Sequence, residues 1–214
     1  MSTSTTSPPA AALPDLQHAV DERGVALDRV GVCDLRYPIT VLDRAQETQQ
    51  VAATFSLAVD LPAEVKGTHM SRFIEILDEH RGEITVKTLP GLLAIMRERL
   101  EAETAHAEIA FPYFMERTAP VSGKKAFMDY ECGFKARRDA DSYDFALSVR
   151  VPVKSLCPCS KAISEYGAHN QRGIVEIEIR TVGEEIVWIE ELVDYAEKSA
   201  SSPVYPLLKR DDER

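Results

Sequence analysis

The sequence predicts an α+β protein built on a mostly antiparallel sheet. Long segments rich in β-branched and aromatic residues follow one another along the chain, joined by short polar turns as in hairpins. Segments whose apolar residues recur at helical spacing come in blocks between these strands. Blocks of strands and blocks of helices are typical of α+β folds with antiparallel sheets.

The expected order of elements is β-β-α-α-β-β-β-β-α. Strands are expected over residues 31–43, 49–62, 105–116, 126–137, 143–156 and 174–182, and helices over 71–80, from Thr88 to Leu100, and over about 184–199. Thr88 is expected at the N-cap of the second helix, with Pro90 in its first turn. A short extended piece is expected over residues 204–210.

This order divides into two ββααββ-type modules. The first module is expected over residues 25–125 and the second over 126–214, where neither a second helix nor a closing strand follows. Residues 1–12, rich in Ser, Thr, Pro and Ala, are expected to be a disordered lead-in to a domain over residues 13–214.

The composition argues against two classes of protein, non-specific nucleic-acid binders and membrane-spanning proteins. The net charge of −10 argues against non-specific binding to nucleic acid, and no apolar run is long enough to cross a membrane. The N-terminus lacks the features of a secretory signal, so a cytoplasmic protein is expected. In the reducing cytoplasm, the cysteines are expected to be free thiols and not disulfides. Cys33 and Cys132 are interpreted as small buried apolar residues.

The stretch SLCPCSKAISEYGAHNQRG at residues 155–173 holds the chemically distinctive residues. A redox pair is weakly supported, because only Pro158 separates Cys157 from Cys159. A structural zinc site lacks a second pair of ligands. A catalytic metal site, in which Cys157 and His169 supply two ligands and a carboxylate a third, fits better. From the residues alone, an alternative stays open in which Cys157 is a core thiol and His169 is a capping or turn residue.

The motif CPCSKAISEYGAHNQRG resembles the signature of the type IB GTP cyclohydrolase I family. The segments LPDLQ, GVCDLRYPI, KGTHMSRF, FPYF, APVSG, MDYEC and PVYPLLKR agree in the same order, so the resemblance covers residues 13–214. It implies the tunnelling fold (T-fold), with helices on one face of an antiparallel sheet, and assembly into toroids such as homotetramers with active sites at subunit interfaces.

The resemblance also implies the reaction and its residues. The family hydrolyses GTP at C8, releases formate and leaves 7,8-dihydroneopterin triphosphate, a pterin that enters folate biosynthesis. A divalent metal (zinc, manganese or iron) would be held by Cys157, His169 and Glu213, of which Cys157 and His169 are also the catalytic candidates. The candidates for substrate binding are His69, Ser71, Arg72, Lys161, Gln171 and Arg172.

Family members are expected to continue past the segment KRDDE with a helix that anchors the purine and a final strand. A second hypothesis is therefore a non-catalytic T-fold protein that binds a purine or pterin, or that serves as an assembly subunit. A third hypothesis is a thiol-based redox protein that uses Cys157 and Cys159.

Overall fold

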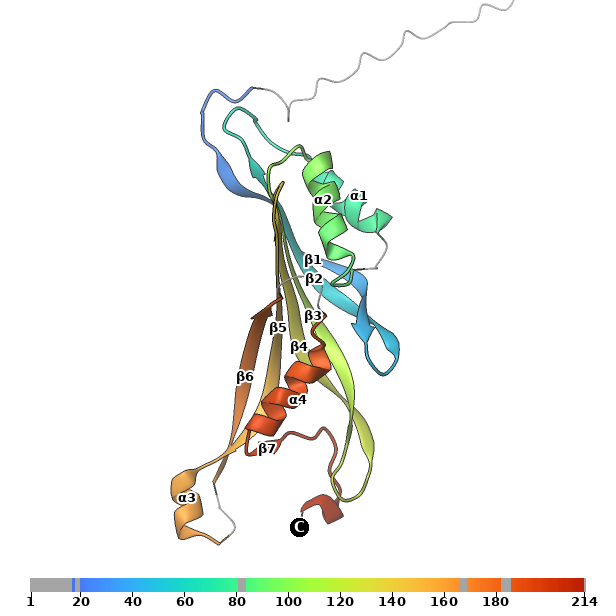
Figure 1. Ribbon diagram of the computed structural model, residues 1–214, viewed down its shortest axis with the longest axis vertical. Helices are drawn as coiled ribbons and strands as arrows, with labels where there is room; N and C mark the ends of the chain where they lie inside the picture. The colour runs from blue at the N-terminus through green and yellow to red at the C-terminus, as the bar shows by residue number, and fades with distance from the viewer. Residues whose placement is uncertain (1–16, 18–19, 81–83, 166–168, 182–185, 214) are drawn as a thin grey trace, which may run out of the picture.

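The computed structural model describes residue 17 and residues 20–80, 84–165, 169–181 and 186–213. Within these residues, six long strands pair antiparallel in chain order, and a short seventh strand pairs with the fifth (Figure 1). The elements are β1 Leu27–Asp43, β2 Glu47–Leu61, α1 Met70–Glu79, α2 Leu89–Arg99, β3 Ala105–Thr118, β4 Lys125–Arg138, β5 Tyr143–Leu156, α3 Pro158–Ile163, β6 Asn170–Arg180, α4 Ile189–Ser199, β7 Ser202–Pro203 and the 3-10 turn η1 Arg210–Glu213.

The two faces of the sheet differ because successive side chains of a strand point to opposite sides. In β2, Ala53, Phe55 and Leu57 are buried, whereas Thr54 and Ser56 between them are partly exposed. The same alternation runs through β3, β4 and β5. One face of the sheet therefore belongs to the core, and the other is open.

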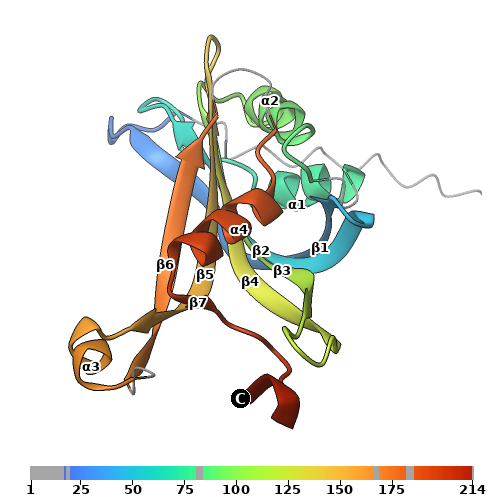
Figure 2. The same cartoon turned by 60° about the horizontal axis from the view of Figure 1, so that its bottom comes forward.

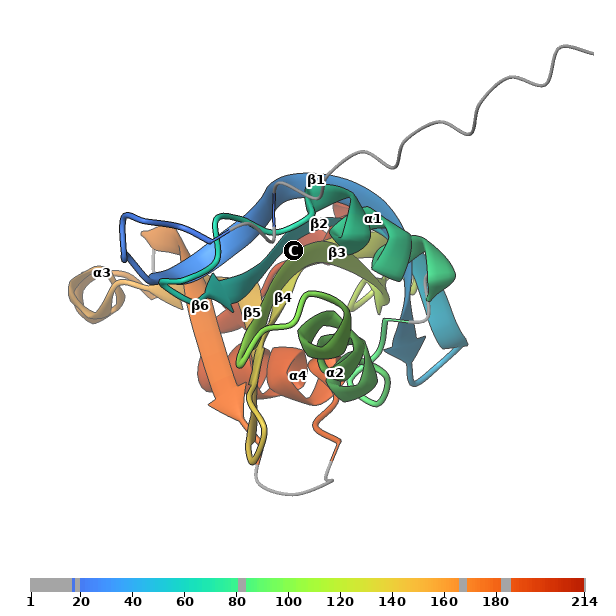
Figure 3. The same ribbon diagram turned by 90° about the horizontal axis from the view of Figure 1, so that it is seen from above.

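The three longer helices cover the same face. The buried residues of α1, α2 and α4 join those of the strands in one continuous core cluster. Figure 3 shows α2 and α4 inside the curve of the sheet, whereas the short α3 lies outside that curve, next to one end of β6. The predicted α+β class with an antiparallel sheet and helices on one face is confirmed.

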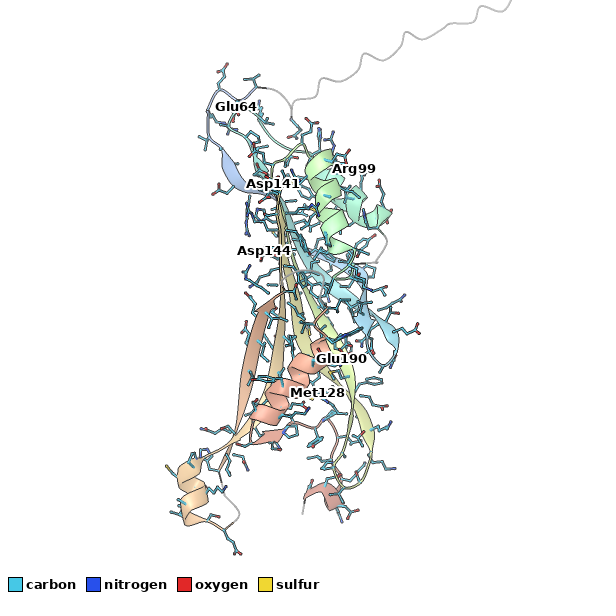
Figure 4. All side chains as sticks on the ribbon, in the orientation of Figure 1. Glu64, Arg99, Met128, Asp141, Asp144 and Glu190 are labelled. Carbon is cyan, nitrogen blue, oxygen red and sulfur yellow. The ribbon has the colours of Figure 1, made fainter. Side chains whose placement is uncertain are left out.

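A polar network fastens α4 to the sheet. Arg117 on β3 donates from Nε to the Tyr130 hydroxyl (2.8 Å) and from Nη2 to Oε1 of Glu197 (2.7 Å). At the start of α4, Tyr113 donates its hydroxyl proton to Oε1 of Glu190 (2.7 Å), which Figure 4 labels. Burial raises the pKa of Tyr130 to about 12, so its hydroxyl stays protonated. Both ends of α4 are thus held by hydrogen bonds to β3.

The predicted strands and the first two helices are confirmed. Thr88 occupies the N-cap position of α2, but its side chain makes no capping hydrogen bond to that helix. Its Oγ1 instead accepts a hydrogen bond from the backbone N–H of Thr85 (2.9 Å). The expected extended piece over residues 204–210 ends in η1.

The predicted start of the last helix was wrong. The helix begins at Ile189, residues 186–188 are not helical, and residues 182–185 lie outside the described part of the chain. Trp188 at the N-cap has an extended backbone (φ −85°, ψ 141°). Glu190 and Glu191 then fill the first turn, where acidic side chains favour a helix start.

The interpretation of Cys33 as buried was also wrong, whereas Cys132 is buried as predicted. The register of β1 against β2 shifts between Val32 and Leu35, and Asp34 has a positive φ of 55°. Such a bulge redirects the side chains of its strand, and Cys33 is exposed.

The division into two modules stays a prediction, and the lead-in over residues 1–12 lies outside the described residues. Strands β3 and β4 meet at the predicted boundary and pair along their whole length. Thr118 pairs with Lys125 at one end of the ladder, and Ala105 pairs with Arg138 at the other. Among the described helices, none combines the length and the apolar character needed to span a bilayer.

The aromatic core supplies a test of the fold. Phe134 is 3% exposed, and its ring centroid lies 4.8 Å from that of Phe111 and 5.5 Å from that of Phe145. We expect Phe134→Ala to lower the free energy of unfolding by about 3–5 kcal/mol, because it leaves a cavity in the core. Phe127, on the same strand but 58% exposed, provides the control. Phe127→Ala should change the stability by less than about 1 kcal/mol in urea titrations. Equal losses in the two variants would contradict this placement of the core.

Candidate functional site

The β5–β6 ladder brings Cys157 and His169 together. Leu156 pairs with Asn170 at the end of the ladder. One step further, the backbone N–H of Cys157 donates to the carbonyl of His169 (3.0 Å). The backbone N–H of His169 donates in turn to Oγ of Ser160 on α3 (2.9 Å). The predicted pair is therefore adjacent in space, although twelve positions separate it in the sequence.

The sulfur of Cys157 lies in surroundings that favour the thiolate. Cys157 is the N-cap residue of α3, and Pro158 is in the first turn of that helix. Hydrogen bonds from the backbone of Ser160, from the His169 side chain and from the backbone of Cys159 lower the pKa of the Cys157 thiol below its ordinary value of 9.0. A thiolate is the form that binds metals and acts as a nucleophile.

The other predicted residues of this motif surround the pair. Lys161 lies in the last turn of α3, and its backbone N–H donates to the Cys157 carbonyl (3.1 Å). Gln171 and Arg172 lie at the start of β6 opposite Ser155 and Lys154. All three side chains are exposed, so this end of the sheet offers positive charge to solvent.

Glu213 lies in another part of the molecule. Figures 1 and 2 both show η1 away from α3. The neighbouring Asp212 fastens η1 to the turn between β3 and β4. Its Oδ1 accepts hydrogen bonds from the backbone N–H groups of Val121 (2.9 Å) and Ser122 (2.8 Å). Its Oδ2 accepts from Ser122 Oγ and Lys209 N, both at 2.7 Å.

The predicted metal ligands are therefore only partly gathered in one chain. Among the described residues, which include Cys157, His169 and Glu213, no group of three or more His, Cys, Asp or Glu side chains is close enough to hold a metal ion. A sulfur and an imidazole nitrogen suit zinc, but two donors do not complete a site. Thus a single chain does not fit the metal as predicted, and the ligand set stays a prediction.

The candidates from KGTHMSRF lie at the opposite end of the sheet from α3 (Figure 1). His69 is the N-cap residue of α1, and Ser71 lies in the first turn. Arg72 donates from Nη1 to the carbonyl of Arg99 at the end of α2 (2.8 Å). Arg72 thereby ties the two helices together, a structural role that its sequence position did not reveal.

Comparison with known proteins gives a consistent family. A family model described as "GCHY-1: Type I GTP cyclohydrolase folE2" matches residues 13–214. The chain is 50% identical over 202 residues to GTP cyclohydrolase FolE2 of Geobacter sp. (strain M21), covering 94% of this chain and 74% of that protein. It is 50% identical to the FolE2 of Geobacter sulfurreducens and 47% identical to that of Fervidobacterium nodosum, in each case over 202 residues, 94% of this chain and 77% of the relative. The matches confirm the resemblance at the level of type I GTP cyclohydrolase, and the family designation they give is FolE2.

The lowered pKa of Cys157 predicts its reactivity in metal-free protein. Because the hydrogen bonds to the sulfur favour the charged form, alkylation of Cys157 by iodoacetamide should reach half of its plateau rate at a pH below 9.0. His169→Gln removes one of these bonds and should move the profile to higher pH, with the rate at pH 7 falling by several-fold, about 3–10 times. Mass spectrometry of the modified peptides gives the rates, with the exposed Cys33 as an internal control. An unchanged profile in His169→Gln would refute the predicted contact.

Proposed function

Because the chain belongs to the type I GTP cyclohydrolase FolE2 family, we propose that it is a cytoplasmic enzyme that hydrolyses GTP. Water would open the imidazole ring at C8, release this carbon as formate and leave 7,8-dihydroneopterin triphosphate for folate biosynthesis. The observation that carries this proposal is the pairing of Cys157 with His169 inside the family-matched segment. The finer type IB designation rests on the motif at residues 157–173 and belongs to the same proposal.

The residues around Cys157 suit such a reaction. The thiolate of Cys157 and the ring of His169 offer one sulfur and one nitrogen donor to zinc, manganese or iron. Lys161 and Arg172 are exposed cations beside them. Because phosphate oxygens are strong acceptors for charged donors, these two side chains are suited to the triphosphate tail of GTP. We include Gln171 among the substrate contacts as a neutral donor and acceptor.

A second copy of the chain would complete the site. His69, Ser71 and Arg72 lie at the far end of the molecule from Cys157, and the hydrogen bonds of Asp212 keep Glu213 beside the β3–β4 turn. For these residues to act on one GTP molecule, they must come from different copies. We therefore propose a homo-oligomer, with a homotetramer as the simplest form of the family's toroid, whose T-fold subunits share active sites at their interfaces.

The activity is tested by incubating the full chain with GTP and zinc or manganese. The product is detected by neopterin fluorescence after oxidation and dephosphorylation. We expect Cys157→Ser to lower the turnover rate by about 100-fold or more, and Cys159→Ala to leave it within about 3-fold of the unsubstituted chain. GTP binding without turnover would favour the non-catalytic alternative. Equal losses on substituting either cysteine would favour the redox hypothesis.

The shared site is tested by mixing two inactive variants. Cys157→Ser and Glu213→Gln chains should each be nearly inactive alone. If Glu213 serves the Cys157–His169 pair of another copy, co-expression should restore part of the activity, because some interfaces then combine an intact Cys157 with an intact Glu213. Co-expression of Cys157→Ser with His169→Gln is the control. These two residues lie together in one chain, so no mixed interface regains both. An equal recovery in the control, or none in the test pair, would contradict the proposed sharing of the site.

A further inference from the structure

The open face of the sheet carries a basic pocket outside the site described above. It has a volume of about 160 Å³ and lies over β3, β4, β5 and β6, with one residue from β1. Its lining includes the cations Arg29, Lys135, Arg137 and Arg180 and the carboxylates Glu108 and Asp144. Positive groups therefore outnumber negative groups here, although the whole chain has a net charge of −10.

The cations of the pocket differ in how firmly they are engaged. Arg29 donates to Glu108 (2.9 Å), and Arg180 donates to Asp144. Lys135 donates to Glu178, also at 2.9 Å. Arg137 is held more loosely, with Nη2 at 3.4 Å from Oδ2 of Asp139. Its side chain is half exposed, so Arg137 retains donors for a further anion.

His106 supplies a second polar group to the pocket. Its side chain lies on the open face of β3, and its ring makes no hydrogen bond within the described parts of the chain. Partial burial lowers the pKa of His106 below its ordinary value of 6.5, and Arg29 and Arg137 lower it further. Asp60 and Glu108 oppose this effect by favouring the charged ring, so His106 is in the field of both arginines and carboxylates. A bound anion would offset the repulsion between the ring and the two arginines.

We propose that this pocket binds a phosphate-bearing anion, with Arg137 and His106 as its principal donors. A guanidinium suits phosphate because its donors match two oxygens at once. The volume exceeds the ~30 Å³ that one water occupies in the liquid several times over, so a phosphate group can enter.

The pocket is separate from the Cys157–His169 pair. Asp144 stands near the start of β5, and Cys157 follows directly after its end, so the 14-residue strand lies between them. At 3.2–3.4 Å per residue, the extended strand separates the two positions by roughly 43 Å within one chain. The inference therefore does not depend on the proposed hydrolysis of GTP.

Calorimetric titration with inorganic triphosphate tests the proposal. The full chain carries Cys157→Ser throughout, so that turnover at the candidate active site is removed. We expect saturable binding that weakens about 10-fold in Arg137→Gln, which loses a charge-assisted pair of hydrogen bonds. Arg150→Gln is the matched control. It removes the same charge from the same face, but Arg150 lies outside this pocket and pairs with Glu131 and Glu176. The control should bind within about 2-fold of the parent.

The outcomes separate a specific site from a general charge effect. No saturable binding, or equal losses in Arg137→Gln and Arg150→Gln, would overturn the proposal. His106→Gln gives an independent check and should also weaken binding, by about 3–10 times. Parallel titrations with orthophosphate and ATP identify the source of the phosphate. If Arg137→Gln weakens ATP binding as it weakens triphosphate binding, the pocket takes the tail of a nucleotide. If Arg137→Gln weakens the binding of triphosphate and orthophosphate but not that of ATP, the pocket binds free phosphates.

Discussion

The register of the antiparallel sheet is the constraint on which the rest of the structure depends. A shift of one residue between two strands would move every apolar side chain of one strand to the opposite face. In the observed register, Leu147 faces Ile179 and Val149 faces Ile177, so the core sides of β5 and β6 coincide. The same register ends with Leu156 beside Asn170, and this end point places Cys157 beside His169. The register of the sheet thus determines both the core packing and the positions of Cys157 and His169.

The register also determines what each face can do. The core face accepts the helices, and α4 is fastened there through Arg117 and Glu197. Burial raises the pKa of Glu197, while Arg117 and Tyr130 oppose that rise by pairing with the carboxylate. The open face instead collects charged side chains from neighbouring strands, and cross-strand ion pairs such as Lys135–Glu178 form between them. An exposed pair of this kind adds little stability, so these charges remain available for ligands or for another copy of the chain.

Periodicity predicted the long elements, and interactions distant in the sequence account for most of what was missed. Strand β5 was predicted at its observed bounds, because apolar residues recur at every second position from Phe145 to Val153. The start of α4 was misplaced because Ile186 continues the helical spacing of apolar residues, although residues 186–188 are not helical. At the bulge that exposes Cys33, the residue with a positive φ is Asp34, where a glycine would have been the stronger sequence signal. The tether from Asp212 to Ser122 joins positions 90 residues apart, and nothing in KRDDE distinguishes Asp212 from Asp211 in advance.

This tether bears on how the candidate site is completed. A catalytic zinc usually has three protein ligands, each about 2.0–2.3 Å from the ion, so the third donor must approach Cys157 and His169 closely. Within one chain, moving Glu213 there would break the hydrogen bonds of Asp212 to Val121, Ser122 and Lys209. Binding a neighbouring copy in the right orientation would require none of these bonds to break. If Glu213 is the third ligand, as we propose, assembly of two chains is the less costly route to a complete site, because it leaves the hydrogen bonds of Asp212 and the β5–β6 ladder intact.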